Sequence, residues 1–211
     1  MSAAQRHHQA AQALLQRFLR LTGCFPLTSV GLLAATLAFS TMASEIKQAD
    51  IKFTGRTYQY HFTLELQAPI EAVRDIVTDY DNLARINDDI VQSETLERYG
   101  ERQLKRRMWL NHCVLVFCFD LYFVENVEEL DDGTITTTVI AAESNFRRGY
   151  SKWRIDSVSD TVTRISVEAE QEPDFWFPPI IGPIIFKRAF IKEVSETGNK
   201  IEHEAKRAKV E

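Results

Sequence analysis

Glycine, proline and cysteine are all scarce in this chain of 211 residues, which has eight, six and three of them respectively. So few glycines and prolines exclude a collagen-like or low-complexity protein. With 45% hydrophobic and 26% charged residues the composition is that of a globular protein, and the length suits one domain with an appendage, or at most two small domains. The net charge of -5 offers no basic face for phosphate groups, so no nucleic acid partner is expected.

The motifs of common enzyme classes are also missing. The chain contains no His-Glu-x-x-His, no Gly-x-Ser-x-Gly and no glycine-rich loop that would bind phosphates. Beyond residue 43 its histidines are His61, His112 and His203, which are too scattered in the sequence to indicate a metal set. We therefore predict no catalytic residue, no metal site and no cofactor, and we favour a non-enzymatic role over an enzymatic one.

Acidic residues are absent from residues 1–43, which contain three arginines, whereas residues 44–211 carry a net charge of -8. Residues 21–44 are uncharged, and Thr41 and Ala43 follow the apolar run at the spacing that signal peptidase reads. We predict that residues 1–43 are a signal peptide cleaved before Ser44, or alternatively a retained membrane anchor. The body would then be exported, periplasmic or membrane-associated. A cytosolic protein with a misassigned start is the remaining alternative.

The cysteines do not clearly indicate a disulfide or a lipid anchor. Cys24 ends a Leu-Thr-Gly-Cys sequence like a bacterial lipobox, but it begins the apolar run that a lipidated cysteine should end. Cys113 and Cys118 lie within one apolar segment, residues 113–126, that we interpret as a single strand. Five residues of extended chain would separate their Cα atoms by about 16 Å, more than the roughly 7 Å that a disulfide allows. We predict two buried thiols.

Hydrophobic periodicity predicts one strand, two short helices, six further strands and a long helix. Asp131-Asp132-Gly133 is a strong hairpin signal within this series. The strands are expected at 58–66, 90–99, 102–110, 113–126, 134–142, 150–158 and 162–171, and the helices at 69–80, 83–86 and 184–210. Such a sheet has inward aromatic side chains and only one long helix to cover them, so a strongly curved sheet would leave a cavity.

This order of elements resembles the helix-grip fold of the START-like superfamily. Residues 68–83, Ala-Pro-Ile-Glu-Ala-Val-Arg-Asp-Ile-Val-Thr-Asp-Tyr-Asp-Asn-Leu, resemble the start of its first two helices, and residues 177–185 resemble exported bacterial members. The resemblance covers residues 55–209. It implies an α+β fold, with a seven-stranded curved antiparallel sheet, two short helices and a long C-terminal helix, in a ligand-binding domain over residues 44–211.

The superfamily includes polyketide cyclase/dehydrase-related and coenzyme-Q-binding proteins, and it binds lipids, quinones, sterols and polyketides on one scaffold, so the resemblance does not specify the ligand.

Arg106 shares an expected strand face with Leu104, Met108 and Leu110. If it points inward it needs a carboxylate or a ligand headgroup as partner, whereas a bulge would turn it outward. Several aromatic residues share inward faces in the same way, either as a pocket wall or as ordinary core. The predicted ligand-binding residues are Phe62, Leu64, Arg106, Met108, Phe117, Phe119, Leu121, Phe123, Trp153, Ile155, Phe186 and Phe190.

Residues 175–185 contain three aromatic residues, three prolines and no charge. We predict that this segment contacts a membrane surface or closes the pocket as a lid. The residues expected to do so are Phe175, Trp176, Phe177, Ile180 and Ile181.

The leading hypothesis is therefore non-enzymatic binding or transport of a hydrophobic small molecule, such as a lipid or an isoprenoid quinone, between the sheet and the C-terminal helix. Burial of apolar ligand surface contributes roughly 25 cal/mol per Å² and needs no polar motif. Two alternatives stay open. One is a cyclase/dehydrase-type enzyme that uses Arg106 or a nearby tyrosine or histidine, and the other is a protein-interaction module with a filled core. The sequence leaves the oligomeric state undetermined.

Overall fold

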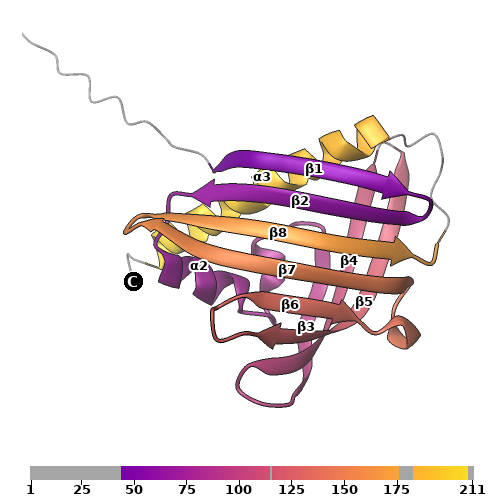
Figure 1. Ribbon diagram of the computed structural model, residues 1–211, viewed down its shortest axis with the longest axis horizontal. Coiled ribbons are helices and arrows are strands. Elements are labelled where there is room, and N and C mark those ends of the chain that lie inside the picture. The colour runs from indigo at the N-terminus through magenta and orange to yellow at the C-terminus, as the bar shows by residue number, and fades with distance from the viewer. Residues whose placement is uncertain (1–43, 115, 176–182, 209–211) are drawn as a thin grey trace, which may run out of the picture. The chain divides into compact units, whose positions relative to one another are not determined.

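A computed structural model describes residues 44–114, 116–175 and 183–208. Their main feature is an eight-stranded antiparallel sheet with the strand order β1-β2-β8-β7-β6-β5-β4-β3 (Figure 1). The strands are β1 Glu45–Thr54, β2 Thr57–Leu66, β3 Ile90–Arg98, β4 Gln103–Val114, β5 Phe117–Glu129, β6 Ile135–Val139, β7 Phe146–Ser159 and β8 Val162–Pro173. The helices are α2 Ile70–Val77 and α3 Pro183–Arg207, and two short 3-10 helices, η2 and η3, span Leu83–Arg85 and Ala141–Glu143.

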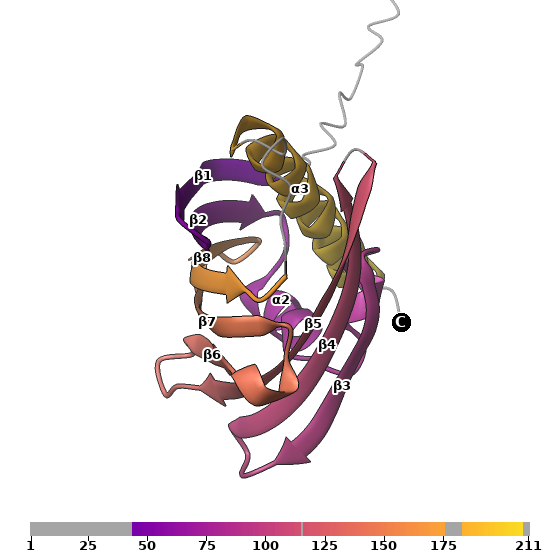
Figure 2. The ribbon, with the colours of Figure 1, turned by 90° about the vertical axis from the view of Figure 1, so that its right-hand side faces the viewer.

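The sheet curves around α3. Figure 2 shows β1 and β2 on one side of this helix and β3, β4 and β5 on the other. Helix α3 contacts β1, β2, α2 and β4, which lie at different places along the curved sheet. The helix-grip fold expected from the sequence is therefore present, because one amphipathic helix covers the inner face of one sheet. None of the helices in the described ranges is long and apolar enough to cross a membrane.

Strand β1 is an eighth strand, in addition to the seven predicted from the sequence. It pairs with β2 along its length and forms one edge of the sheet. Its inward residues, Ile46, Ala49 and Ile51, are half-buried, but a register shift between Ile46 and Gln48 interrupts the alternation. Because an irregularity of this kind puts apolar residues three apart instead of two, the strand lacks the strict period on which the prediction relied.

The prediction of two buried thiols is wrong. Cys113 and Cys118 form a disulfide, with their Cα atoms 4.0 Å apart, and both residues are exposed. The error came from the assumption of one strand over 113–126, whereas β4 ends at Val114 and β5 begins at Phe117. The two cysteines are therefore direct cross-strand partners beside a hairpin turn. No glycine or proline lies within residues 113–118 to signal that turn.

The predicted hairpin at Gly133 is confirmed and also anchors α2. Gly133 has a φ of 74°, a left-handed conformation that glycine adopts without strain. Its carbonyl accepts a hydrogen bond of 3.2 Å from Arg74 Nη1, and Arg74 Nη2 donates to the Ile155 carbonyl at 3.0 Å. One arginine of α2 thus binds two backbone carbonyls of the sheet. Val73, Ile76 and Val77 bury the apolar face of the same helix.

Helix α3 packs closely against β2 where glycine interrupts its sequence. A Cβ atom built on Gly198 would lie 2.7 Å from Cδ2 of Leu64 and 2.9 Å from Oγ of Ser44. Gly198 therefore permits α3 to approach β2 closely. The packing gained there offsets part of the helix stability that a glycine costs. Beyond it, Ile201 and Ala205 are buried, and the Glu202 carboxylate accepts a 2.7 Å hydrogen bond from the Gln67 backbone N–H.

Candidate functional site

A cavity of about 960 Å³ lies between the sheet and α3. Its lining comes mainly from β2, β4, β5, β7, β8 and the helix, and most of it is apolar or aromatic. The volume is at the upper end of the range of typical small-molecule sites, about 300–1,000 Å³. The wall includes the following aromatic residues: Phe53, Tyr58, Tyr60, Phe62, Phe119, Phe123, Phe146, Trp153, Phe175, Phe186 and Phe190.

Aromatic side chains from β2 and α3 meet along one side of the cavity. Tyr58, Tyr60 and Phe62 stack in a row with ring centroids 6.2 and 6.3 Å apart, because alternate residues of a strand face the same side. Phe190 lies 5.0 Å from the Tyr60 ring, and Phe186, one helical turn earlier, lies 5.8 Å from the Tyr58 ring. The helix thus contacts the strand through large flat side chains rather than through close backbone packing.

Ten of the twelve residues predicted to bind ligand line this cavity: Phe62, Leu64, Arg106, Met108, Phe119, Leu121, Phe123, Trp153, Phe186 and Phe190. The other two, Phe117 and Ile155, do not. Ile155 is 3% exposed and belongs to the core, where it pairs with Ile165. Phe117 is the first residue of β5, next to the hairpin turn, and lies beyond the cavity wall.

Only one of the five residues predicted to contact a membrane or act as a lid lies in the described part of the chain. Phe175 lines the cavity, and its ring lies 5.9 Å from those of both Phe119 and Phe146. Its carbonyl accepts a 3.3 Å hydrogen bond from Arg56 Nη2. The other four, Trp176, Phe177, Ile180 and Ile181, fall outside the described residues.

Arg106 points inward and is paired with a carboxylate. Arg106 on β4 and Glu125 on β5 are opposite one another in the register, and Nε and Nη2 each lie 2.6 Å from Glu125 Oε1. Their exposed fractions are 8% and 3%, so the outward bulge considered above is wrong. The guanidinium also lies 5.1 Å from the centre of the Tyr80 ring, a distance suited to a cation–π contact.

Glu125 was missed by sequence reasoning, although a signal for it was present. Phe119, Leu121 and Phe123 alternate on one face of β5, and Glu125 is the next residue on that face. Burial and the nearby Glu125 carboxylate raise the pKa of Tyr60, which keeps its phenol neutral. This part of the cavity therefore combines a buried ion pair with neutral aromatic groups.

A short chain of polar side chains lies on the same inner surface. Trp153 Nε1 donates to Ser151 Oγ at 3.0 Å, and the hydroxyls of Ser151 and Thr137 are 2.8 Å apart. All three residues line the cavity. These bonds satisfy polar atoms that would otherwise be unpaired in an apolar wall.

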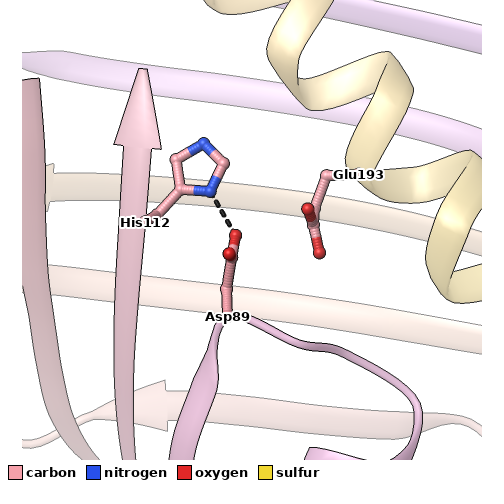
Figure 3. Close-up of side chains that lie close together, drawn as sticks. All are labelled: Asp89, His112 and Glu193. Atoms are coloured by element: carbon pink, nitrogen blue, oxygen red, sulfur yellow. Dashed lines mark hydrogen bonds and ion pairs between the residues drawn. The ribbon is translucent and has the colours of Figure 1, made fainter. Parts of the chain in front are cut away.

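A second polar cluster, Asp89, His112 and Glu193, lies on the cavity wall (Figure 3). The His112 ring donates a hydrogen bond from Nδ1 to the Asp89 carboxylate, and Glu193 faces them from α3. Burial raises the pKa of the Glu193 carboxyl, and the charge of Asp89 raises it further. Sequence reasoning missed Asp89 and Glu193 and discounted His112, since these residues meet only in the folded chain.

Comparison with protein families matches residues 58–200 to the model described as polyketide cyclase/dehydrase and lipid transport. Three similar solved structures are a START superfamily protein from Mycobacterium smegmatis, an aromatase/cyclase from a Streptomyces species, and the human StAR-related lipid transfer protein 5. Their sequence identities are 19%, 14% and 15%, with TM-scores of 0.55, 0.57 and 0.55. Comparison with curated proteins found no match.

These structural matches extend over most of each protein. They cover 71%, 72% and 95% of this chain and 98%, 94% and 97% of the matched chains, in the same order. At such low identity they establish the fold. Proteins with this fold include both a lipid transfer protein and an aromatase/cyclase, so the fold alone does not distinguish a carrier from an enzyme.

Proposed function

Because the chain belongs to the polyketide cyclase/dehydrase and lipid transport family, we propose that it binds and carries a hydrophobic small molecule, a lipid or an isoprenoid quinone. The observation that supports this proposal most directly is the aromatic-lined cavity of about 960 Å³ between the sheet and α3. A filled interior would have favoured an interaction module, and the cavity argues against that alternative.

The energetics of the cavity suit an apolar ligand. A ligand that buries about 400 Å² of apolar surface gains on the order of 10 kcal/mol. Lost translational and rotational freedom alone costs about 4–15 kcal/mol, so net affinity requires a ligand that buries a larger apolar area than this. An aromatic wall adds contacts with unsaturated chains or quinone rings without the entropic cost of ordering long flexible side chains.

The direct experiment is extraction of the purified full-length protein into organic solvent, followed by mass spectrometry of the extract. We expect a co-purified lipid or quinone, and saturable binding of about one equivalent when the emptied protein is titrated with either class. Absence of both co-purified ligand and titratable binding would overturn the proposal. Selective binding of one class would identify the chemical class of the ligand.

A bulky side chain on the cavity wall provides a matched test of location. Ala189 of α3 lines the cavity, whereas Lys192 on the same helix is exposed and lies outside the lining. We expect Ala189→Trp to reduce ligand capacity several-fold, since the indole occupies cavity volume. Lys192→Trp adds the same group to the surface and should leave capacity unchanged. Equal capacity in both variants would place the ligand elsewhere.

An enzymatic role is the second candidate, and it is favoured by the polar groups on the cavity wall. A buried pair of Arg106 and Glu125 and a histidine hydrogen-bonded to Asp89 could support acid/base steps on a polyketide-like substrate. Incubation with the ligand recovered by extraction separates the two roles. A carrier returns the ligand chemically unchanged, whereas conversion to a product would establish an enzyme.

We also propose that the protein acts outside the cytoplasm. The charge pattern of residues 1–43 supports this proposal, and so does the exposed disulfide between Cys113 and Cys118, because such bonds are rare in the reducing cytosol. Mass analysis of the protein from fractionated cells is the test. We expect a mature chain that begins at Ser44 and lacks two hydrogens at the cysteines. A full-length cytosolic protein with free thiols would contradict it.

A further inference from the structure

Three potential metal ligands converge on the cavity wall from places far apart in the sequence. Asp89 immediately precedes β3, His112 lies near the end of β4, and Glu193 lies on α3 (Figure 3). One ligand atom from each residue lies within 4.8 Å of the other two. Donors about 2.0–2.2 Å from a common ion lie roughly 3–4 Å from one another, so small side-chain movements would bring these three into coordination.

We propose that Asp89, His112 and Glu193 bind one divalent transition-metal ion of the Zn²⁺ class. One imidazole nitrogen and two carboxylate oxygens form a donor set of borderline character, which suits such an ion better than the all-oxygen sets preferred by Mg²⁺ and Ca²⁺. The scattered histidines had argued against a metal site. In the folded chain, two of the three ligands are carboxylates, Asp89 and Glu193. Neither residue lies in a recognisable metal-binding motif, so the sequence did not indicate them.

The first two ligands are held together by the backbone. The Asp89 carbonyl accepts a 2.8 Å hydrogen bond from the Asn111 N–H, and the Asp89 N–H donates to Asn87 Oδ1 at 2.8 Å. Because Asn111 directly precedes His112, these bonds keep the carboxylate of Asp89 beside the imidazole. The pair is thus preorganised by the β3–β4 pairing.

The third ligand is positioned by contacts further along α3. Thr197, one turn after Glu193, accepts a 3.5 Å hydrogen bond from Asn87 Nδ2. Lys200, about two turns after Glu193, forms a 2.5 Å ion pair with Asp88. Since residues separated by one or two helical turns share a helix face, both contacts direct Glu193 toward Asp89 and His112.

The charges at the site are incompletely balanced. Among the described residues no lysine or arginine forms an ion pair with Asp89 or Glu193; Asp89 is paired with His112, and the nearby Lys200 is paired with Asp88. The side chains of His112 and Asp89 are 23% and 25% exposed, which leaves less solvent screening than at an open surface. A divalent cation would neutralise both carboxylates at once.

Coordination requires only a local rearrangement. Metal binding through Nδ1 of His112 would place the ring proton on Nε2, and Asp89 would exchange its hydrogen bond for coordination. Three protein ligands leave at least one coordination position for water or another oxygen donor. All three residues line the cavity, so that position would face the interior where the proposed ligand binds.

Calorimetric titration of the EDTA-treated, untagged full-length protein with Zn²⁺ tests the site. We expect one high-affinity equivalent in the unaltered protein and at least a tenfold weaker affinity in both Glu193→Gln and His112→Gln. Glu196→Gln is the matched control, because it makes the same carboxylate-to-amide change on α3 at an exposed residue that pairs with Lys192 and does not line the cavity. The histidines are identical in the Glu193→Gln and control proteins. Any Zn²⁺ binding at histidines outside the site therefore contributes equally to both titrations.

Thermal unfolding supplies a second measurement on the same proteins. At Zn²⁺ concentrations about 100-fold above Kd, the melting temperature of the unaltered protein should rise by roughly 5–10 °C. The rise should be lost in Glu193→Gln and His112→Gln and kept in Glu196→Gln. Metal-free melting temperatures verify that each variant is folded.

Equal Zn²⁺ affinity in all four proteins, or no high-affinity binding in the unaltered one, would overturn the proposal. Equal affinity for Mg²⁺ would overturn the assignment to a transition metal. Hydrophobic-ligand binding is measured on metal-free protein, so failure of the metal site and failure of the carrier function give separate results.

Discussion

The two halves of helix α3 contact the same sheet in opposite ways. The C-terminal half forms a closed end with β2 and α2, in which Leu66, Val73 and Ala205 have exposed fractions of 0–1%. The N-terminal half covers the cavity and meets the sheet through Phe186 and Phe190. Along β2 the inward side chains become more buried from one end to the other, with exposed fractions of 8% at Phe62, 2% at Leu64 and 0% at Leu66.

Side-chain size explains this difference. At the closed end, Gly198 and Ala205 allow the helix to approach the sheet, so aliphatic side chains fill the interior. At the cavity end, large aromatic rings on β2 and α3 lie between the helix and the sheet. The closed end therefore provides stability, while the cavity end provides space for a ligand. Four predictions test this division of roles.

The largest effect is expected at the ion pair on the cavity wall. Glu125→Leu leaves the buried guanidinium of Arg106 without its carboxylate, and should lower the free energy of unfolding by about 4 kcal/mol. The double variant Glu125→Leu with Arg106→Met should recover most of that loss, since neither charge remains. Urea unfolding measures both. A double variant as unstable as the single one would mean that shape rather than charge dominates.

Truncation of a core residue at the closed end should have the next largest effect. Leu66→Ala removes a fully buried side chain and should cost about 3 kcal/mol of unfolding free energy, with little change in ligand affinity. Phe190→Ala at the cavity end should show the reverse pattern, a smaller loss of stability and a several-fold loss of affinity. Equal losses of stability would remove the distinction between the two ends.

The disulfide is expected to contribute less, because it closes a short loop. Cys113 and Cys118 are five residues apart, and loop-closure entropy for such a loop corresponds to about 2 kcal/mol. Replacement of both by serine should lower the melting temperature and leave the closed end folded, as amide hydrogen exchange would report. Increased exchange throughout the closed end would show that the hairpin supports the whole sheet.

The smallest effect is expected from Gly198→Ala. The added methyl group would press on Leu64 and Ser44, while alanine has the better helix propensity, so the net loss should be about 1 kcal/mol. Glu196→Ala is the control on the same helix, since Glu196 is half-exposed and pairs with Lys192 on the helix surface. If Gly198→Ala stabilised the protein, the close approach described above would be incorrect.

Much of the fold could be predicted because its signals are local. The alternation of β2 and β5 identified their inward faces, and the Asp-Asp-Gly sequence identified the turn at Gly133. Strand β1 was missed because an irregularity breaks its period. The β4–β5 turn was missed because it lies inside an apolar run without glycine or proline. That second error also produced the wrong prediction for Cys113 and Cys118.

The sequence by itself determined which side chains face inward, because strand and helix periods depend only on neighbouring residues. Only the tertiary structure decided what those inward side chains do. Phe123 borders a cavity while Ile155 fills a core, although both lie on inward faces. The carboxylate partner of Arg106 and the meeting of His112 with Glu193 likewise depend on strand register and helix placement, which bring together residues far apart in the chain.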